Sequence, residues 1–225
     1  MPPHATYSQL AHAYLRNLKR KLVKPTPYSI EWLKSKGLFT MGKHSYATPR
    51  VHYYDGDTAR IIIGDWSALA AEVEILPGGN HRLDSAASFP IERRLGLPLD
   101  KASLDVWNKG DVVIGSDVWI GRSTLIMGGV SIGHGAVIAA RSTVTKDVEP
   151  YSVVAGAPAR LLRKRFDAST INALLRIAWW DWPEDVIRQR VATLASPDLH
   201  KFITMYDSDN DNSTRQPPSL TVGNQ

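Results

Sequence analysis

The 225-residue sequence contains no cysteine, no long apolar run and no secretory leader pattern. Without cysteine, the chain cannot form a disulfide, a cysteine-ligated zinc site or a cysteinyl acyl-enzyme. The absence of an uninterrupted run of about 18 apolar residues excludes a membrane-spanning helix. The first residues, MPPHATYSQLAHAY, lack the basic and apolar regions of a signal peptide. These absences predict a soluble, cytoplasmic protein.

Acidic residues are fewer than basic ones, 22 against 27, which leaves a formal net charge of +5. A basic balance suggests an anionic ligand or surface, such as nucleic acid, a phosphorylated cofactor, an anionic glycan or a membrane face. The basic residues cluster towards the two ends of the chain rather than along an aromatic-rich groove. We therefore expect no nucleic-acid partner.

β-Branched residues recur every six positions in the second half of the chain. They are Ile114, Ile120, Ile126, Ile132, Ile138 and Val144. Four positions after each comes a second row of small or β-branched residues, namely Val118, Thr124, Val130, Ala136, Ser142 and Val148. A helix would repeat at 3.6 residues and a strand at 2. A six-residue period instead predicts short flat strands joined by tight corners, with three hexads to a triangular coil and coils stacked into a solenoid.

The same register recurs upstream, at Ile63, Leu69 and Ile75, and Met41 is a candidate start of a still earlier coil. A segment without the repeat, the loop 81–110, separates the two halves. A long loop inside a regular solenoid is usually functional.

The flanks differ in kind from the coils. The sequence predicts a basic helical segment over 1–36, the repetitive core over 37–160, C-terminal helices over 161–206 and a disordered tail over 207–225. Ser169 is the expected N-cap of the first C-terminal helix.

His81 follows a regular coil at the mouth of the loop, in the sequence PGGNHRLD. A neutral imidazole can take a proton from a hydroxyl at pH 7. Gly78 and Gly79 would let the backbone approach a ligand closely. The group that orients the imidazole is open: Glu74, Asp84 and backbone carbonyls are all candidates. An ordinary loop histidine is the alternative.

The chain resembles the xenobiotic acetyltransferase branch of the hexapeptide-repeat acyltransferases. The resemblance spans roughly 37–194 and rests on the motifs GGNHRLDSAASFP, DVVIGSDVWIGRSTLIMGGVSIGHG, VVAGAPARLLRKRF and AWWDWP. This branch includes chloramphenicol and streptogramin acetyltransferases of the hexapeptide type and many sugar O-acetyltransferases. The resemblance implies an all-β core, a left-handed parallel β-helix, with an extended loop and flanking α-helices. It also implies a homotrimer whose sites are shared between subunits.

The resemblance implies acetyl-CoA-dependent O-acetyl transfer, directly to an acceptor hydroxyl, with His81 as the catalytic base and no metal. Expected acceptor contacts flank it at Asn80, Arg82 and Asp84. The expected acetyl-CoA contacts are Trp119, Gly121, Gly128, Gly129, Ala139, Ala157, Arg163, Lys164 and Arg165. The glycines could equally serve tight corners, and the basic residues could equally form a solvated face.

Two other interpretations compete with an acetyltransferase: a zinc enzyme and a non-catalytic scaffold. A β-helix zinc enzyme needs three histidines converging from adjacent coils. His81 and His134 alone do not supply them, and His134, in the sequence GHG, is expected at the surface. A non-catalytic hexapeptide scaffold would leave the GGNH motif and the long loop unexplained.

The N-terminal segment bears on the acceptor. A helix over about 8–24 would carry a basic face of Arg16, Lys19, Arg20, Lys21 and Lys24. Such a face can lie on the inner membrane surface or steer an anionic glycan. We therefore expect the hydroxyl of a glycan or glycolipid sugar rather than an antibiotic, and possible peripheral membrane contact. The alternative is a helix packed on the trimer.

Overall fold

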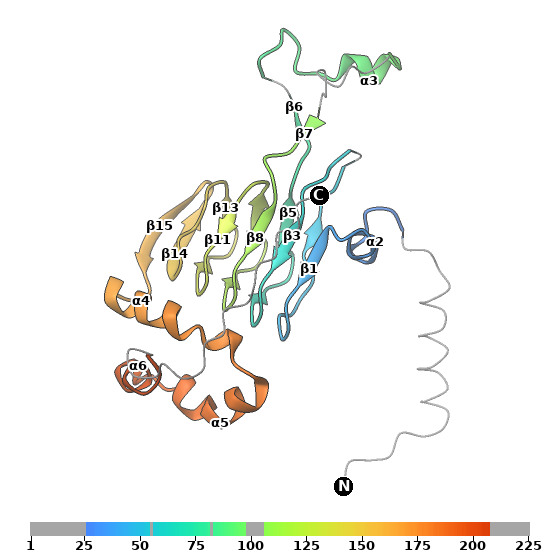
Figure 1. Ribbon diagram of the computed structural model, residues 1–225. Coiled ribbons are helices and arrows are strands. Elements are labelled where there is room, and N and C mark those ends of the chain that lie inside the picture. The colour runs from blue at the N-terminus through green and yellow to red at the C-terminus, as the bar shows by residue number, and fades with distance from the viewer. Residues whose placement is uncertain (1–25, 55, 82, 98–105, 208–225) are drawn as a thin grey trace, which may run out of the picture.

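The computed structural model describes residues 26–54, 56–81, 83–97 and 106–207 (Figure 1). The expected basic helix over 8–24, with its membrane or glycan contact, lies outside these residues. So does almost all of the expected C-terminal tail.

The core is a parallel β-helix in which each coil contributes strands to three sheets. The first sheet contains β1 (Phe39–Met41), β3 (Ile61–Ile63), β8 (Val112–Ile114) and β11 (Ser131–Ile132). The second contains β2 (Arg50–Val51), β5 (Glu74–Leu76), β10 (Leu125–Met127) and β13 (Thr143–Val144). The third contains β4 (Ala68–Leu69), β9 (Trp119–Ile120), β12 (Val137–Ile138), β14 (Ser152–Gly156) and β15 (Ala159–Lys164). All pairings in these sheets are parallel except that of β14 with β15.

Both predicted rows of side chains point into the coil. The six β-branched residues from Ile114 to Val144 are at most 2% exposed, and the second row, from Val118 to Val148, is also buried. The two hydroxyls in the second row stay satisfied, because Thr124 donates to the Gly121 carbonyl and Ser142 to the Ala139 carbonyl. The hexapeptide interpretation of the sequence is confirmed.

The coils keep their register across the long loop. Ile63 pairs with Ile114 although the loop intervenes, and β4 and β5 likewise stack on β9 and β10. Met41 pairs with Ile63, which confirms the earlier coil suggested by the sequence. Helix α2 (Ile30–Ser35) packs its fully buried Leu33 on the core next to this first coil.

The loop leaves the β-helix through a short antiparallel hairpin of β6 (Asn80–His81) and β7 (Val106–Trp107). It carries α3 (Ile91–Leu95) and projects away from the coils (Figure 1). The C-terminal helices lie on the opposite side in the same view, so the molecule has two unlike appendages.

The C-terminal appendage begins after β15, which continues the third sheet to Lys164. It comprises α4 (Ala168–Ile177), the 3-10 helix η2 (Trp179–Asp181), α5 (Glu184–Leu194) and α6 (Leu199–Tyr206). The N-cap of α4 is Asp167, whose side chain accepts from the Thr170 N–H, so the expected cap at Ser169 is wrong by two residues. Ser169 instead bonds its hydroxyl to Asp167.

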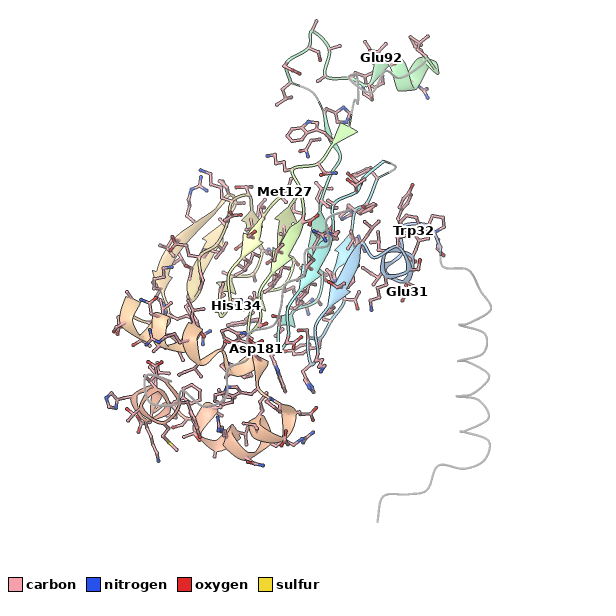
Figure 2. The ribbon with its side chains drawn as sticks, viewed as in Figure 1. Glu31, Trp32, Glu92, Met127, His134 and Asp181 are labelled. Carbon is pink, nitrogen blue, oxygen red and sulfur yellow. The ribbon has the colours of Figure 1, made fainter. Side chains whose placement is uncertain are left out.

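His134 and Trp180 join this appendage to the coils. Their rings stack with centroids 4.6 Å apart and planes within 4°. The Ser116 N–H donates to His134 Nδ1 at 2.9 Å. The surface role expected for His134 is therefore wrong: it is a half-buried packing residue, near Asp181 (Figure 2). Burial lowers its pKa, against a raising effect of Asp181.

Candidate active site

A glycine-rich turn leads from the last strand of a coil to His81. A side chain on Gly78 would collide with the Asp57 carboxylate, and Gly79 has a φ of +76° with the Tyr54 ring against it. Both glycines are thus needed for close approach, but to Asp57 and Tyr54 of the same chain rather than to a ligand. The turn fixes where the β6 strand, and with it His81, starts.

The imidazole of His81 is oriented by a backbone carbonyl. Nδ1 lies 2.9 Å from the Ser88 carbonyl oxygen, within the loop. A carbonyl only accepts, so in this arrangement Nδ1 carries the hydrogen and the neutral ring keeps a lone pair on Nε2. His81 is exposed, so this lone pair is open to an incoming hydroxyl.

The sequence left open which group orients the imidazole: Glu74, Asp84 or a backbone carbonyl. In the structure it is a backbone carbonyl, that of Ser88. Glu74 is engaged elsewhere, because its carboxylate contacts His52 Nε2 across two neighbouring coils. Asp84 lies exposed in the loop. Sequence reasoning could not single out Ser88, because any residue type supplies the same backbone oxygen.

The residues that flank His81 have different surroundings. The Asn80 side-chain amide donates to the Trp107 carbonyl at 3.0 Å and braces the β6–β7 hairpin. Its expected acceptor contact therefore has a competing structural role. Arg82, also expected to contact the acceptor, lies outside the described residues.

The glycines expected along the acetyl-CoA groove are tightly enclosed by their own chain. A side chain on Gly121 would meet the Ala140 backbone of the next coil at 2.5 Å. One on Gly128 would meet the Pro77 carbonyl oxygen at 1.9 Å, and one on Gly129 the Lys109 carbonyl oxygen at 2.5 Å. All three therefore have the corner role that the sequence left open, and Gly128 and Gly129 lie against both ends of the long loop.

The other groove candidates are more accessible. Trp119 is 58% exposed on β9, although it lies in a strand between two others. Ala139 is half-buried at the end of β12, and Ala157 is exposed in the turn between β14 and β15. Trp119 thus offers a large free aromatic face on the outer surface of the third sheet.

The three basic residues expected to contact acetyl-CoA differ in their surroundings. Arg163 is exposed, and Lys164 Nζ pairs with Glu149 at 2.6 Å. The Arg165 guanidinium donates to the Gly135 carbonyl at 2.8 Å and lies 3.4 Å from Asp117. Because that guanidinium is held between the coils and the C-terminal helices, Arg165 is better assigned to structure than to CoA phosphates.

The sequence also matches known proteins. Residues 111–146 match the family described as bacterial transferase hexapeptide (six repeats). The chloramphenicol acetyltransferase of Escherichia coli is 45% identical over 143 residues, which are 62% of this chain and 68% of that protein. The chloramphenicol acetyltransferase of Agrobacterium fabrum is 35% identical over 191 residues, 79% of this chain and 91% of that protein.

This chain belongs to the hexapeptide-repeat acetyltransferases. The matched proteins confirm the xenobiotic acetyltransferase-like branch inferred from the motifs. Among solved structures, a hexapeptide-repeat-containing acetyltransferase from Vibrio cholerae O1 biovar eltor, complexed with acetyl coenzyme A, is 28% identical, with a TM-score of 0.42 over 72% of this chain and 92% of that one.

The described part of this acetyltransferase contains no group of three or more histidine, cysteine, aspartate or glutamate side chains that could hold a metal ion. Nor does any helix in this part have the length and apolar character needed to cross a membrane.

Proposed function

We propose that this acetyltransferase moves the acetyl group of acetyl-CoA directly to an acceptor hydroxyl, with His81 Nε2 as the general base. The observation that carries the proposal is the Nδ1 contact to the Ser88 carbonyl, because it leaves Nε2 unprotonated and exposed. Acetyl-CoA is the donor of these acetyltransferases.

The transfer needs one proton-accepting group and no covalent enzyme intermediate. Nε2 takes the hydroxyl proton while the acceptor oxygen attacks the thioester carbonyl carbon. A backbone N–H of a neighbouring coil would stabilise the tetrahedral oxyanion. The carbon–sulfur bond then breaks, and the imidazolium returns its proton to the CoA thiolate.

The acceptor class is best approached through the named relatives. Proteins named for chloramphenicol, macrolide and virginiamycin acetylation match this chain at 35–45% identity. These names favour an antibiotic-like alcohol, the alternative that the sequence ranked second. The glycan or glycolipid sugar remains the other candidate, and its argument rests on the basic segment over 8–24.

The assembly follows from the family. We infer a homotrimer of left-handed β-helices, with acetyl-CoA held in grooves between neighbouring subunits. The exposed Trp119 face and the exposed Arg163 are the candidates for donor contact that keep an open surface. Lys164 is a further candidate, although it is half-buried and pairs with Glu149. Neutralising Arg163 and Lys164 should raise the KM for acetyl-CoA and spare kcat at saturation. An unchanged KM would assign both residues to the solvated face.

The deciding experiment measures free CoA release from acetyl-CoA with a panel of acceptors: chloramphenicol, a macrolide, a streptogramin A and soluble sugars. Turnover on an antibiotic that is lost in His81→Gln supports the proposal. Turnover on sugars alone would favour the glycan alternative. Residues 1–24 are then deleted, since only a glycan or membrane role predicts lost surface binding with retained activity on a small soluble sugar. Release of CoA that survives His81→Gln would contradict the mechanism.

A further inference from the structure

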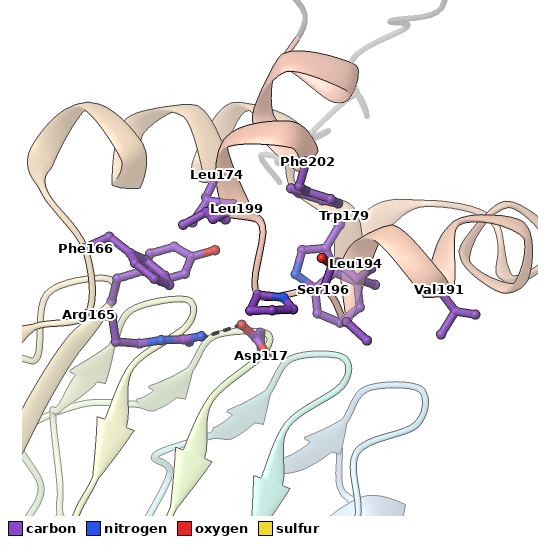
Figure 3. Close-up of a pocket in the computed structure, with 13 residues that line it drawn as sticks. Asp117, Arg165, Phe166, Leu174, Trp179, Val191, Leu194, Ser196, Leu199 and Phe202 are labelled. Atoms are coloured by element: carbon purple, nitrogen blue, oxygen red, sulfur yellow. Dashed lines mark hydrogen bonds and ion pairs between the residues drawn. The ribbon is translucent and has the colours of Figure 1, made fainter.

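A cavity of about 330 Å³ lies between the β-helix and the C-terminal helices (Figure 3). It is on the side of the coils opposite to the projecting loop that starts at His81 (Figure 1). The proposed transfer mechanism makes no use of it. Its volume is near the lower end of the range for small-molecule sites.

Most of the residues that line the cavity are apolar. They are Phe166, Leu174, Trp179, Val191, Leu194, Ala195, Pro197, Leu199 and Phe202, with Ser196 between them. An apolar lining favours a carbon-rich occupant, because transferring apolar surface out of water is favourable. A charged group would have to leave water without compensation from these walls.

One edge of the cavity carries a charge pair that is already balanced. Arg165 lies 3.4 Å from Asp117 and donates to the Gly135 carbonyl (Figure 3). Its guanidinium also lies 5.2 Å from the ring centroids of Tyr151 and Phe166. Since the cation and the carboxylate compensate each other, a further charge from a ligand would be unpaired here.

Tyr151 contributes a buried phenol to the wall of the cavity. The residue is 2% exposed and lines the cavity. Its hydroxyl has no hydrogen-bond partner among the residues that the structure describes. Burial raises the pKa of this phenol, which keeps it a neutral donor. Buried hydroxyls normally have a partner, so an orphan beside a cavity indicates where a ligand oxygen would sit.

We propose that this cavity is a second ligand site, distinct from the transfer site, for a neutral, carbon-rich small molecule that presents a hydrogen-bond acceptor to the Tyr151 hydroxyl. The apolar walls hold the body of the ligand. The balanced Arg165–Asp117 pair selects against a net charge. The hydroxyl selects a carbonyl or ether oxygen over a plain hydrocarbon.

The test titrates the full-length protein with three probes of similar size, using calorimetry or ligand-observed NMR. Benzylacetone is neutral with one carbonyl, butylbenzene lacks the oxygen, and phenylbutyrate carries a charge. We expect saturable binding of benzylacetone at about millimolar or tighter, as suits a small fragment. Butylbenzene should bind more weakly and phenylbutyrate weakest.

Matched variants locate the binding. Tyr151→Phe removes only the hydroxyl, so it should weaken benzylacetone about 3–10-fold and leave butylbenzene unchanged. Its melting temperature should not fall, because the hydroxyl has no hydrogen-bond partner to lose among the described residues. Leu199→Trp and, independently, Leu194→Trp should fill the cavity and abolish binding of both probes, while His81→Ala should bind as the wild type does.

Three outcomes would overturn the second site. They are no saturable benzylacetone binding up to about 10 mM, equal affinity in Tyr151→Phe, and phenylbutyrate binding as tightly as the ketone. Because no readout depends on acetyl transfer, failure here would leave the proposed function of His81 untouched.

Discussion

Two histidines, one on the projecting hairpin and one in a corner of the coils beneath the C-terminal helices, show how a backbone partner decides what an imidazole can do. His81 meets a carbonyl at Nδ1, which makes Nδ1 a donor and frees Nε2 as a base. His134 meets the Ser116 N–H at Nδ1, which makes Nδ1 an acceptor. The neutral rings therefore hold opposite tautomers.

The surroundings of the two rings reinforce this difference. His81 is exposed on a short hairpin. His134 is stacked on Trp180, which is 5% exposed, and lies in the corner between coil and helices. One ring is placed for proton transfer and the other for packing, so exchanging their roles by mutation should fail in both directions.

Removing the imidazole of His81 should have the largest effect. His81→Ala should lower turnover about 10²–10⁴-fold, because the acceptor loses its general base. The melting temperature should stay near that of the wild type, since the ring contributes no core packing. Steady-state CoA release measures the loss of turnover, and thermal unfolding of the same sample measures whether the melting temperature is unchanged. Wild-type turnover in a folded variant would remove His81 from the mechanism.

The reverse pattern is expected for His134→Ala. The Ser116 N–H would lose its acceptor, which costs about 1–3 kcal/mol when the donor is buried. Loss of the stack on Trp180 costs about 0.5–1.5 kcal/mol more. Urea unfolding should therefore show a clear loss of stability, with turnover of the folded enzyme retained.

His44→Ala is the matched control for that loss. His44 also stacks on a tryptophan, Trp66, at 4.0 Å, but its side chain is 37% exposed and it accepts from no backbone N–H in the part of the chain that the structure describes. Its loss should destabilise less than that of His134. Equal losses would mean that the buried backbone bond is not what distinguishes His134.

Asn80→Ala distinguishes two roles for this residue beside His81: bracing the hairpin and contacting the acceptor. Loss of the bond to the Trp107 carbonyl removes about 0.5–1.5 kcal/mol of local support for the hairpin. If Asn80 braces, kcat should fall several-fold with the acceptor KM unchanged, since His81 is then less well positioned. A raised KM with unchanged kcat would instead support the acceptor contact expected from the sequence.

The smallest effect concerns pH. The pKa of His134 is lower in the folded protein than the ordinary 6.5, chiefly because of burial. The folded state thus binds fewer protons, and the free energy of unfolding rises with pH across this interval. The stabilisation is complete above about pH 6.5 and is lost as pH falls through the folded pKa.

Urea unfolding between pH 7.5 and 5 should show this slope in the wild type, and His134→Gln should flatten it. An unchanged slope in the variant would assign the dependence to other groups. Asp117 and Asp181 would not produce it, because burial raises both of their pKa values, so the folded state binds more protons there and their contribution to the free energy of unfolding falls as pH rises.

The sequence predicted the coils well because their physics is periodic. An inward residue every six positions leaves a signal at Ile63, Ile114 and Ile126 that needs no tertiary information. The His81 position was equally visible, since a histidine after two glycines opens the break in that period. Its orienting partner was not, because a backbone oxygen has no residue type.

His134 looks like a surface residue in a repeat corner, and that prediction was wrong because Trp180, which comes later in the chain, stacks on its ring. Arg165 looks like one member of a basic run, and its contacts with Gly135 and Asp117 join positions too far apart in the chain for the sequence to pair them. The glycines were ambiguous because tight corners and ligand approach require the same lack of a side chain. Only the neighbouring coil, at Ala140 and Pro77, distinguishes the two.

The register that survives the long loop has a practical consequence. Stacked residues of the last full coils, Ile114 and Ile132, are 18 positions apart, whereas the stacked pair Ile63 and Ile114 is 51 apart. The excess of 33 residues adds nothing to the stacking and enters and leaves through one narrow hairpin. Such an insertion can be replaced without disturbing the stacking of the coils. Grafting a loop from a relative between Gly79 and Gly110 could change what is acetylated while the scaffold stays as it is.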